Sequence, residues 1–180
     1  MYVVTRNDRV RELAELPQSS IGAPCPMILV GEHSLRIAYY LEETEAGWDG
    51  TTVRLLSADE GNEPCAVVDF ITPYAHMFGP PNDEAFSGHP LAERGLRPYG
   101  AFEVEGSSWL GTLERMNSVH PYHQTERFKK YRHFILSFHD ATFECIAESF
   151  TLITCRGSVD AVLRQPNMRP NKSLERTREG

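Results

Sequence analysis

Cysteine is scarce in this sequence, and its four residues include no C-x-x-C pair. Zinc-ribbon and thioredoxin-like sites depend on such pairs, so both classes are excluded. In a reducing compartment we expect the four thiols to behave as small buried hydrophobic groups. They are Cys25, Cys65, Cys145 and Cys155.

Long apolar runs are missing as well. No stretch approaches the roughly 20 apolar residues that a membrane-spanning helix needs, and charge follows the first few residues too soon for the apolar region of a signal peptide. Glycine-rich phosphate loops are also absent, because segments 79–81 and 106–108 fit neither a dinucleotide-binding motif nor a P-loop. We therefore expect a cytoplasmic protein without a membrane partner and without a nucleotide cofactor.

Positive charge is in short supply outside the C-terminal segment. The net charge is −7, and residues 164–180 carry five basic and two acidic side chains. Subtracting this +3 from −7 leaves −10 for residues 1–163. A body of this charge repels a phosphate backbone, so we expect no nucleic-acid partner.

The residues that are present are typical of one α+β domain. With 180 residues, 41% of them hydrophobic, the chain can build one core of ordinary size but not two. We expect residues 1–19 to form an N-terminal extension with a short helix at 7–16. Residues 20–163 are expected to form the single domain, and residues 164–180 a disordered basic tail.

Within the domain, short segments with a period of two and short connections predict a mainly antiparallel sheet of six or seven strands. Prolines and glycines predict a long irregular segment at 76–98 that closes one end of the sheet. The principal helix is expected at 107–118, whereas 126–131 fit either a helical turn or a loop. The expected strands are 27–30, 35–42, 51–57, 65–71, 99–105 and the two arms of a hairpin at 131–148, with 150–155 as a candidate for one more.

The hairpin has one apolar and one polar face. A two-residue turn at 140–141 places Phe138 opposite Phe143, and Ser137 opposite Glu144. The apolar face is expected to join the core. The polar face carries His133, Ser137, His139, Thr142 and Glu144.

Histidines and carboxylates gather in this hairpin and in the irregular segment. A long irregular segment in a small domain is usually functional, so we expect a site for a protein or a small molecule between the two. The candidate binding residues are Asn82, Asp83, Glu84, His89, Arg94, Tyr99 and His133.

Acid–base catalysis is a second interpretation, with His139, Asp140 and Glu144 as candidate catalytic residues. Histidine titrates near neutrality, and a neighbouring carboxylate can orient its ring. However, no G-x-S-x-G motif accompanies them, and Asp140 is also an ordinary turn residue.

A divalent metal site is a third interpretation. His89, His133, His139 and Glu144 are ligands of the right kinds, but no recognised ligand spacing is present. His133 and His139 lie about 20 Å apart along a straight strand. We predict no cofactor, with a divalent metal at these four residues as the alternative. The structural interpretation is that the histidines form hydrogen bonds with polar groups at a sheet edge.

Aromatic side chains and prolines are the last signal. Exposed aromatics beside arginine suit a binding surface, whereas a loop packed over a sheet needs the same residues to stay ordered. We favour the packing interpretation for Phe86 and Trp109. The full set is Phe78, Pro80, Pro81, Phe86, Tyr99, Trp109, Tyr122 and Tyr131.

Several motifs between residues 76 and 146 also recur elsewhere. They are Phe78-Gly79-Pro80-Pro81-Asn82-Asp83-Glu84, Gly88-His89-Pro90-Leu91, Arg94-Gly95-Leu96, Pro98-Tyr99-Gly100-Ala101, Met116-Asn117-Ser118-Val119-His120-Pro121 and Phe138-His139-Asp140-Ala141-Thr142-Phe143-Glu144-Cys145. On these motifs the stretch resembles a family of short bacterial proteins of uncharacterised function. The resemblance implies no activity, cofactor or partner.

Together, these patterns predict a non-enzymatic cytoplasmic protein that binds a ligand or another protein. The alternative is a hydrolase-like enzyme, metal-dependent or acid–base, that uses the histidine and carboxylate cluster.

Overall fold

The computed structural model describes residues 2–42 and 55–165 of the chain. Within these ranges the chain forms strands and a few short helices. The strands are β1 (Arg9–Glu12), β2 (Met27–Gly31), β3 (Ser34–Tyr40), β4 (Glu63–Ile71), β5 (Ala75–Gly79), β6 (Gly100–Glu105), β7 (Arg132–Ser137), β8 (Thr142–Ala147) and β9 (Ser149–Gly157). The helices are α1 (Ser108–Asn117), α2 (Thr125–Phe128) and α3 (Val159–Arg164), with the 3-10 turns η1 (Phe86–Gly88) and η2 (Ala92–Arg94).

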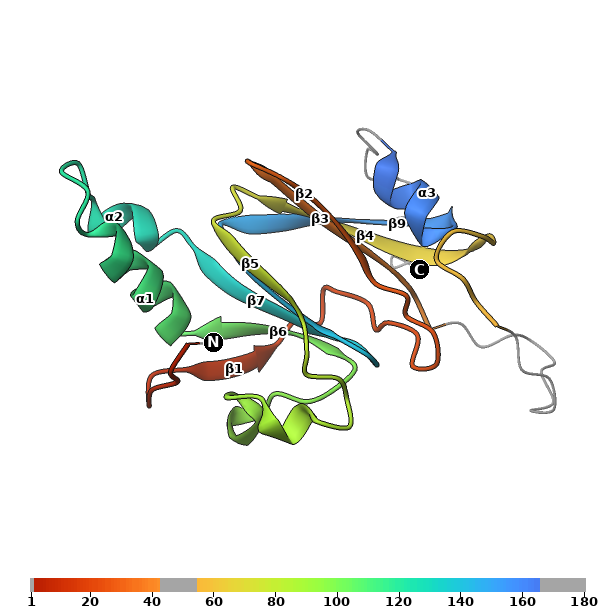
Figure 1. Cartoon of the computed structure of the whole chain (residues 1–180), viewed down its shortest axis with the longest axis horizontal. Helices are drawn as coiled ribbons and strands as arrows, with labels where there is room; N and C mark the ends of the chain where they lie inside the picture. The colour runs from red at the N-terminus through yellow and green to blue at the C-terminus, as the bar shows by residue number, and fades with distance from the viewer. Residues whose placement is uncertain (1, 43–54, 166–180) are drawn as a thin grey trace, which may run out of the picture.

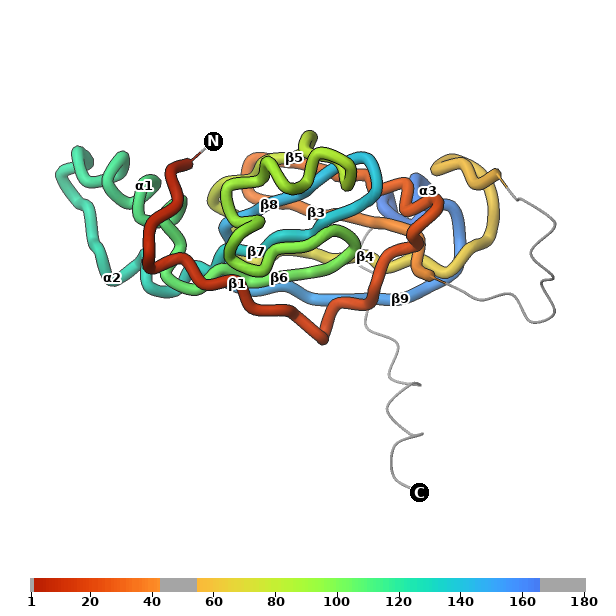
Figure 2. Tube along the Cα trace, turned by 90° about the horizontal axis from the view of Figure 1, so that it is seen from below, coloured from red at the N-terminus to blue at the C-terminus, as the bar shows by residue number. Residues whose placement is uncertain are grey.

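The strands form two sheets, and every pairing between them is antiparallel. One sheet has the order β1-β6-β7-β8-β5 and the other β2-β3-β4-β9. The sheets stack across the body of the molecule, with α1 and α2 at one end of its long axis and α3 at the other (Figures 1 and 2). The α+β class is therefore confirmed, but the expectation of one sheet with six or seven strands is wrong.

The main core lies between the two sheets. Leu35, Ile37 and Tyr39 alternate along β3 and face Phe134 and Phe143 of the other sheet. This alternation buries every second side chain of β3 in the core, as its sequence pattern predicts. The strands expected at 27–30, 35–42 and 65–71 are accordingly present as β2, β3 and β4.

Each sheet also has a covered outer face. On the five-stranded sheet, Ile135 and Ile146 pack against Trp109 of α1 and Leu91 of the irregular segment, which crosses that face in Figure 2. On the other sheet, α3 packs against β3 and β4. Both sheets are thus buried on two sides, which the hairpin's polar outer face did not lead us to expect.

The prediction of a helix at 7–16 is wrong, because Arg9–Glu12 forms the edge strand β1, which pairs with β6. The apolar spacing of Val10, Leu13 and Leu16 fits a helix, but a helix of that length gains little by itself. Pairing with β6 and burial of Leu13 and Leu16 in the core stabilise the strand more than the short helix would be stabilised by itself. The expected N-terminal extension is therefore integrated with the body.

The hairpin is present, but its register differs from the prediction. Ser137 pairs with Thr142 and Leu136 with Phe143, so residues 138–141 form the loop. Ser137 therefore does not face Glu144, which pairs with Ile135. The register shifts by two residues, and a shift of two keeps every side chain on its predicted face.

The remaining expectations have mixed outcomes. Helix α1 and strands β6 and β9 lie where 107–118, 99–105 and 150–155 predict them. Residues 126–131 include the end of α2, and α3 was not anticipated. The expectation of an irregular segment at 76–98 is wrong at its start, because Ala75–Gly79 pairs with β8 as strand β5. Residues 51–54 of the expected third strand and 166–180 of the tail lie outside the described residues, while 55–57 are not strand. None of the described helices is of a length and apolarity that would take it across a membrane.

Candidate functional site

Two histidines from the predicted site surround one buried carboxylate, Glu144 of β8. Its Oε2 accepts hydrogen bonds from the Tyr2 hydroxyl and from His133 Nε2, both at 2.8 Å. Its Oε1 accepts a hydrogen bond from His89 Nε2 at 3.1 Å. We call Tyr2, His89, His133 and Glu144 the Glu144 cluster.

The outer nitrogen of each ring is also bonded. The backbone N–H of Leu91 donates to His89 Nδ1 at 3.1 Å, so the proton of this ring is on Nε2 and points at Glu144. His133 Nδ1 lies 2.9 Å from the hydroxyl of Ser107, which also caps α1 by accepting from the Leu110 N–H. Both rings are therefore fixed from two sides.

The electrostatics of the cluster keep the carboxylate charged. Burial alone raises the pKa of Glu144, but the hydrogen bonds from His133 and His89 outweigh burial and bring the pKa to about 2. Burial, and then the negative charge of Glu144, raise the pKa of the Tyr2 phenol. Across the ordinary pH range the cluster therefore holds one carboxylate among neutral or positive donors.

The Glu144 cluster is closed. The side chains of His89 and His133 are 0% exposed and that of Glu144 is 5% exposed, and each of their ring nitrogens and carboxylate oxygens has a partner. A catalytic carboxylate needs access to substrate, and a catalytic metal needs an open coordination position. Within residues 2–42 and 55–165, no group of three or more metal-ligating side chains is arranged to hold an ion.

A second polar group lies at the loop of the hairpin. His139 Nδ1 is 3.0 Å from Asp83 Oδ2 and 2.8 Å from the Tyr99 hydroxyl, which also donates to Asp83. The backbone N–H of Asp83 donates to the carbonyl of His139, which holds the irregular segment against the hairpin. The hydrogen bond to Asp83 raises the pKa of Tyr99 to about 12, and the same bond lowers the pKa of Asp83.

The ring of His139 is half-exposed, at 43%, and its Nε2 lies 3.9 Å from Asp140. The predicted meeting of the irregular segment with the hairpin therefore exists at this position. It brings together Asp83, Tyr99 and His139, while His133 and Glu144 lie in the closed cluster.

The other predicted residues are not brought together into a site. Asn82 accepts a hydrogen bond from the Ala85 N–H and so shapes the turn before η1. Glu84 and Arg94 are exposed, and neither side chain has a hydrogen-bond or ion-pair partner among the described residues. Asp140 is 86% exposed at the tip of the hairpin loop.

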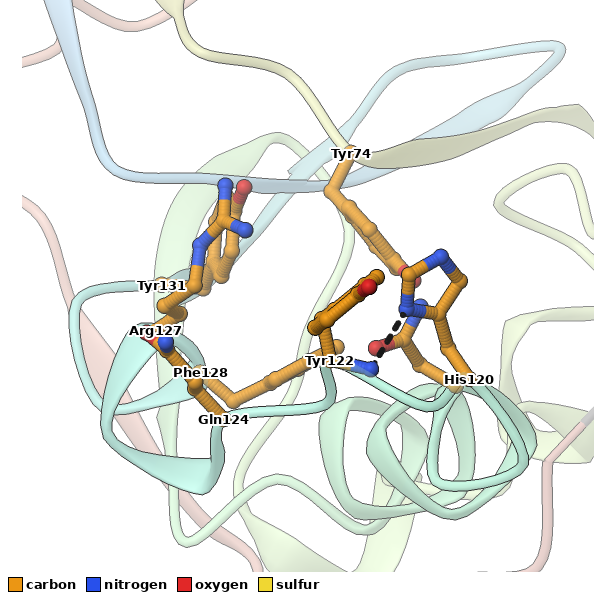
Figure 3. Close-up of a pocket in the computed structure, with 8 residues that line it drawn as sticks. Tyr74, His120, Tyr122, Gln124, Arg127, Phe128 and Tyr131 are labelled. Carbon is orange, nitrogen blue, oxygen red and sulfur yellow. Dashed lines mark hydrogen bonds between the residues drawn. The ribbon is translucent and has the colours of Figure 1, made fainter.

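An open pocket of about 240 Å³ lies at the end of the molecule that carries α1 and α2. Figure 3 shows Tyr131, Arg127, Phe128 and Gln124 along one side and Tyr74 and His120 along the other, with Tyr122 between them. We call this the aromatic pocket. Its lining residues are Tyr74, Asn117, His120, Tyr122, Gln124, Arg127, Phe128 and Tyr131.

Two of the tyrosine rings that line the pocket are held in place by packing against buried Phe128. Phe128 of α2 is buried, and the ring centroids of Tyr74 lie 5.4 Å from Phe128 and 5.3 Å from Tyr131. Tyr74 precedes β5 and Tyr131 precedes β7, so the ends of two strands position both rings. Tyr122, by contrast, is 79% exposed on the loop after α1.

Sequence reasoning named Tyr122 and Tyr131 among the aromatic residues but missed the pocket. Asn117 and His120 lie in the 116–121 motif, which implied no site, and Tyr74 is more than 40 residues before His120 in the chain. Only the pairing of β5 with β8, and of β8 with β7, brings Tyr74 beside Tyr131. The one available signal was the density of aromatic residues between 120 and 131.

Comparison with known proteins gives no family for the chain: no family model, no curated protein and no solved structure matches it.

Proposed function

We propose that this protein is a non-enzymatic binding protein and that the aromatic pocket is its ligand site. The observation that carries the proposal is the contrast in hydrogen bonding. The polar atoms of the Glu144 cluster are satisfied, whereas the pocket combines apolar walls with polar groups such as the Tyr122 hydroxyl and the Arg127 guanidinium, which have no partner among the described residues. Ligand sites typically join apolar walls to a few such groups.

The dimensions of the pocket favour a small ligand. A volume of about 240 Å³ is below the range of roughly 300–1,000 Å³ usual for drug-sized molecules. Aromatic walls favour a planar ring, which stacks offset or edge-on at centroid distances of about 4.5–7 Å. We therefore expect a molecule with one aromatic ring.

The test measures binding of three probes that share one ring and differ in charge: 4-hydroxyphenylacetate, 4-hydroxyphenylethanol and tyramine. Binding is followed by NMR shifts of ¹⁵N-labelled protein. We expect at least one probe to shift the amides around residues 117–131, and Tyr122→Ala to abolish this response. Val119→Ala is the matched control, since Val119 is 88% exposed on the same loop and does not line the pocket.

Two results would overturn the proposal. One is that none of the three probes binds at about 10 mM, a concentration beyond the weakest affinity expected of a real site. The other is that binding survives Tyr122→Ala unchanged.

One observation favours a second function, acid–base catalysis at His139. Its ring is half-exposed and is oriented through Nδ1 by Asp83, as a general base requires. Hydrolysis of 4-nitrophenyl acetate tests this candidate. A rate above that of free imidazole, lost in both His139→Ala and Asp83→Asn, is expected of a catalytic pair; a rate unchanged by either substitution rejects it.

A further inference from the structure

We infer that the aromatic pocket takes an anion, namely a small aromatic carboxylate whose charged group binds at Arg127 and whose ring lies between the tyrosines. This inference rests on the proposed function and names the chemistry of its ligand. It follows from the charge around the pocket, from the hydrogen-bond donors in it and from the exclusion of a cation.

The charge around the pocket opposes that of the rest of the body. Residues 107–132 carry five basic and two acidic side chains, a net +3, in a protein whose net charge is −7. Glu126 binds Lys129 at 2.6 Å, and Arg132 is bound by Glu103 at 2.7 Å outside this segment. Arg127 lines the pocket and has no carboxylate partner among the described residues, so its positive charge is not neutralised at the pocket.

Three of the polar groups that line the pocket can only donate to a ligand. The Tyr122 N–H donates to His120 Nδ1 at 3.1 Å, which leaves the proton of this ring on Nε2. His123 Nδ1 lies 3.0 Å from Asn117 Oδ1, which leaves the amide NH₂ of Asn117 free to donate. With the guanidinium of Arg127, the pocket offers donors of three kinds, and a carboxylate is a pure acceptor.

A cation is the main competing ligand, because tyrosine rings also form cages for quaternary ammonium groups. The eight lining residues include Arg127 and no carboxylate, so a cation would meet the repulsion of Arg127 without a negative charge in the lining to neutralise it. Burial and then the charge of Glu148 raise the pKa of Tyr131, while Arg127 acts on it in the opposite direction. Glu148 is thus outside the lining, and its effect on Tyr131 is opposed by an arginine within the lining.

The planar fork of arginine suits a carboxylate, which it binds through two parallel hydrogen bonds. Arg127 is exposed and makes no side-chain hydrogen bond among the described residues, so it can turn toward a ligand without breaking an existing contact. The ring of the ligand then lies against Tyr122, Tyr74 and Phe128. Charge and aromaticity are thereby recognised by different side chains.

The experiment ranks the three probes by dissociation constant. Because a hydrogen bond to a charged group is worth about a factor of ten or more in affinity, we expect 4-hydroxyphenylacetate to bind about tenfold more tightly than 4-hydroxyphenylethanol. Tyramine should bind most weakly. Arg127→Gln should reduce affinity for the acid about tenfold and change affinity for the alcohol less than about twofold.

Lys130→Gln is the matched control, because it removes the same charge from the same segment at a residue that does not line the pocket. It should leave the affinity for the acid within about threefold of the wild type, since an exposed charge that makes no direct contact with the ligand contributes little. Equal binding of acid and alcohol, both lost in Tyr122→Ala, would overturn the anion inference and leave the proposed function standing. Tightest binding of tyramine would do the same, and an absence of binding by all three probes would overturn both.

Discussion

The Glu144 cluster and the aromatic pocket both contain histidine and tyrosine, yet they differ in burial and in hydrogen bonding. In the cluster, His89 and His133 are fully buried and each ring nitrogen is bonded. In the pocket, His120 is exposed and Tyr122 is 79% exposed. Many polar residues close together in a sequence therefore indicate a hydrogen-bond network. Whether that network is structural or a binding site depends on whether its polar atoms are all bonded within the protein.

The energetics explain why the cluster is complete. A buried carboxylate costs several kcal/mol unless hydrogen bonds and opposite charge compensate it. Glu144 has three donors from three separated parts of the chain, so it ties the N-terminal segment and the irregular segment to the hairpin. The pocket has no such desolvation cost, because its polar groups remain in contact with water.

The largest expected effect comes from breaking the cluster at its centre. Glu144→Ala leaves the hydroxyl of Tyr2 and two histidine nitrogens without their acceptor in the interior. We expect a loss of about 3–5 kcal/mol in the free energy of unfolding, as for the removal of one partner of a buried ion pair. Urea denaturation measures it. Glu84→Ala is the control, because Glu84 is exposed and should change stability by less than about 0.5 kcal/mol.

A loss below about 1 kcal/mol in Glu144→Ala would contradict the comparison. It would mean that the surrounding groups rebond or admit water at little cost, and that the cluster is not what holds the two segments to the sheet.

Acid should have a similar effect on the wild type. The folded pKa of Glu144 is about 2, below its usual 4.5, so the unfolded state binds the proton first as the pH falls. This contribution, about 3 kcal/mol, is complete above about pH 4.5 and is lost as the pH falls toward 2. Urea unfolding at about pH 5 and about pH 2.5 should show a steeper loss in the wild type than in Glu144→Gln. Equal slopes in the two proteins would reject the assignment.

The two histidines of the hairpin give a smaller and more selective comparison. His133→Ala removes a buried ring that links Glu144 to Ser107, and we expect it to cost about 2–4 kcal/mol. His139→Ala removes a ring that is 43% exposed and should cost about 1 kcal/mol or less. Thermal melts of both variants at neutral pH provide the measurement. Similar losses would make His139 a structural residue and remove the support for catalysis there.

Much of the fold could be predicted from the sequence where one pattern had one physical meaning. The alternation along β3 and the Ser107 cap of α1 are of this kind, since each fixes its element locally. The pattern at 7–16 was different. Its apolar spacing fits a helix, but β6 would otherwise have an unpaired edge in its sheet, and Arg9–Glu12 pairs with that edge as β1. Local propensity could not weigh a partner that lies some 90 residues away.

The candidate site followed the same rule. Placing His133 and Glu144 on one face needed only the period of a strand, and that face survives the shift of register. Their burial could not be predicted, because it depends on Tyr2, on α1 and on His89, which reach the hairpin through the tertiary fold. The aromatic pocket was out of reach for the same reason, since Tyr74 joins it only through the order of β5, β8 and β7.

The smallest expected effect sharpens the comparison most, because it concerns the open region. Tyr122→Ala removes a large ring that is 79% exposed and contacts the ring of His120, which is itself exposed. Its loss should therefore change the free energy of unfolding by about 0.5 kcal/mol or less, although it should abolish ligand binding. Urea denaturation beside His133→Ala gives the contrast under one set of conditions. A loss comparable to that of His133→Ala would mean that Tyr122 supports the loop after α1, and the aromatic pocket would then be a packing feature like the cluster.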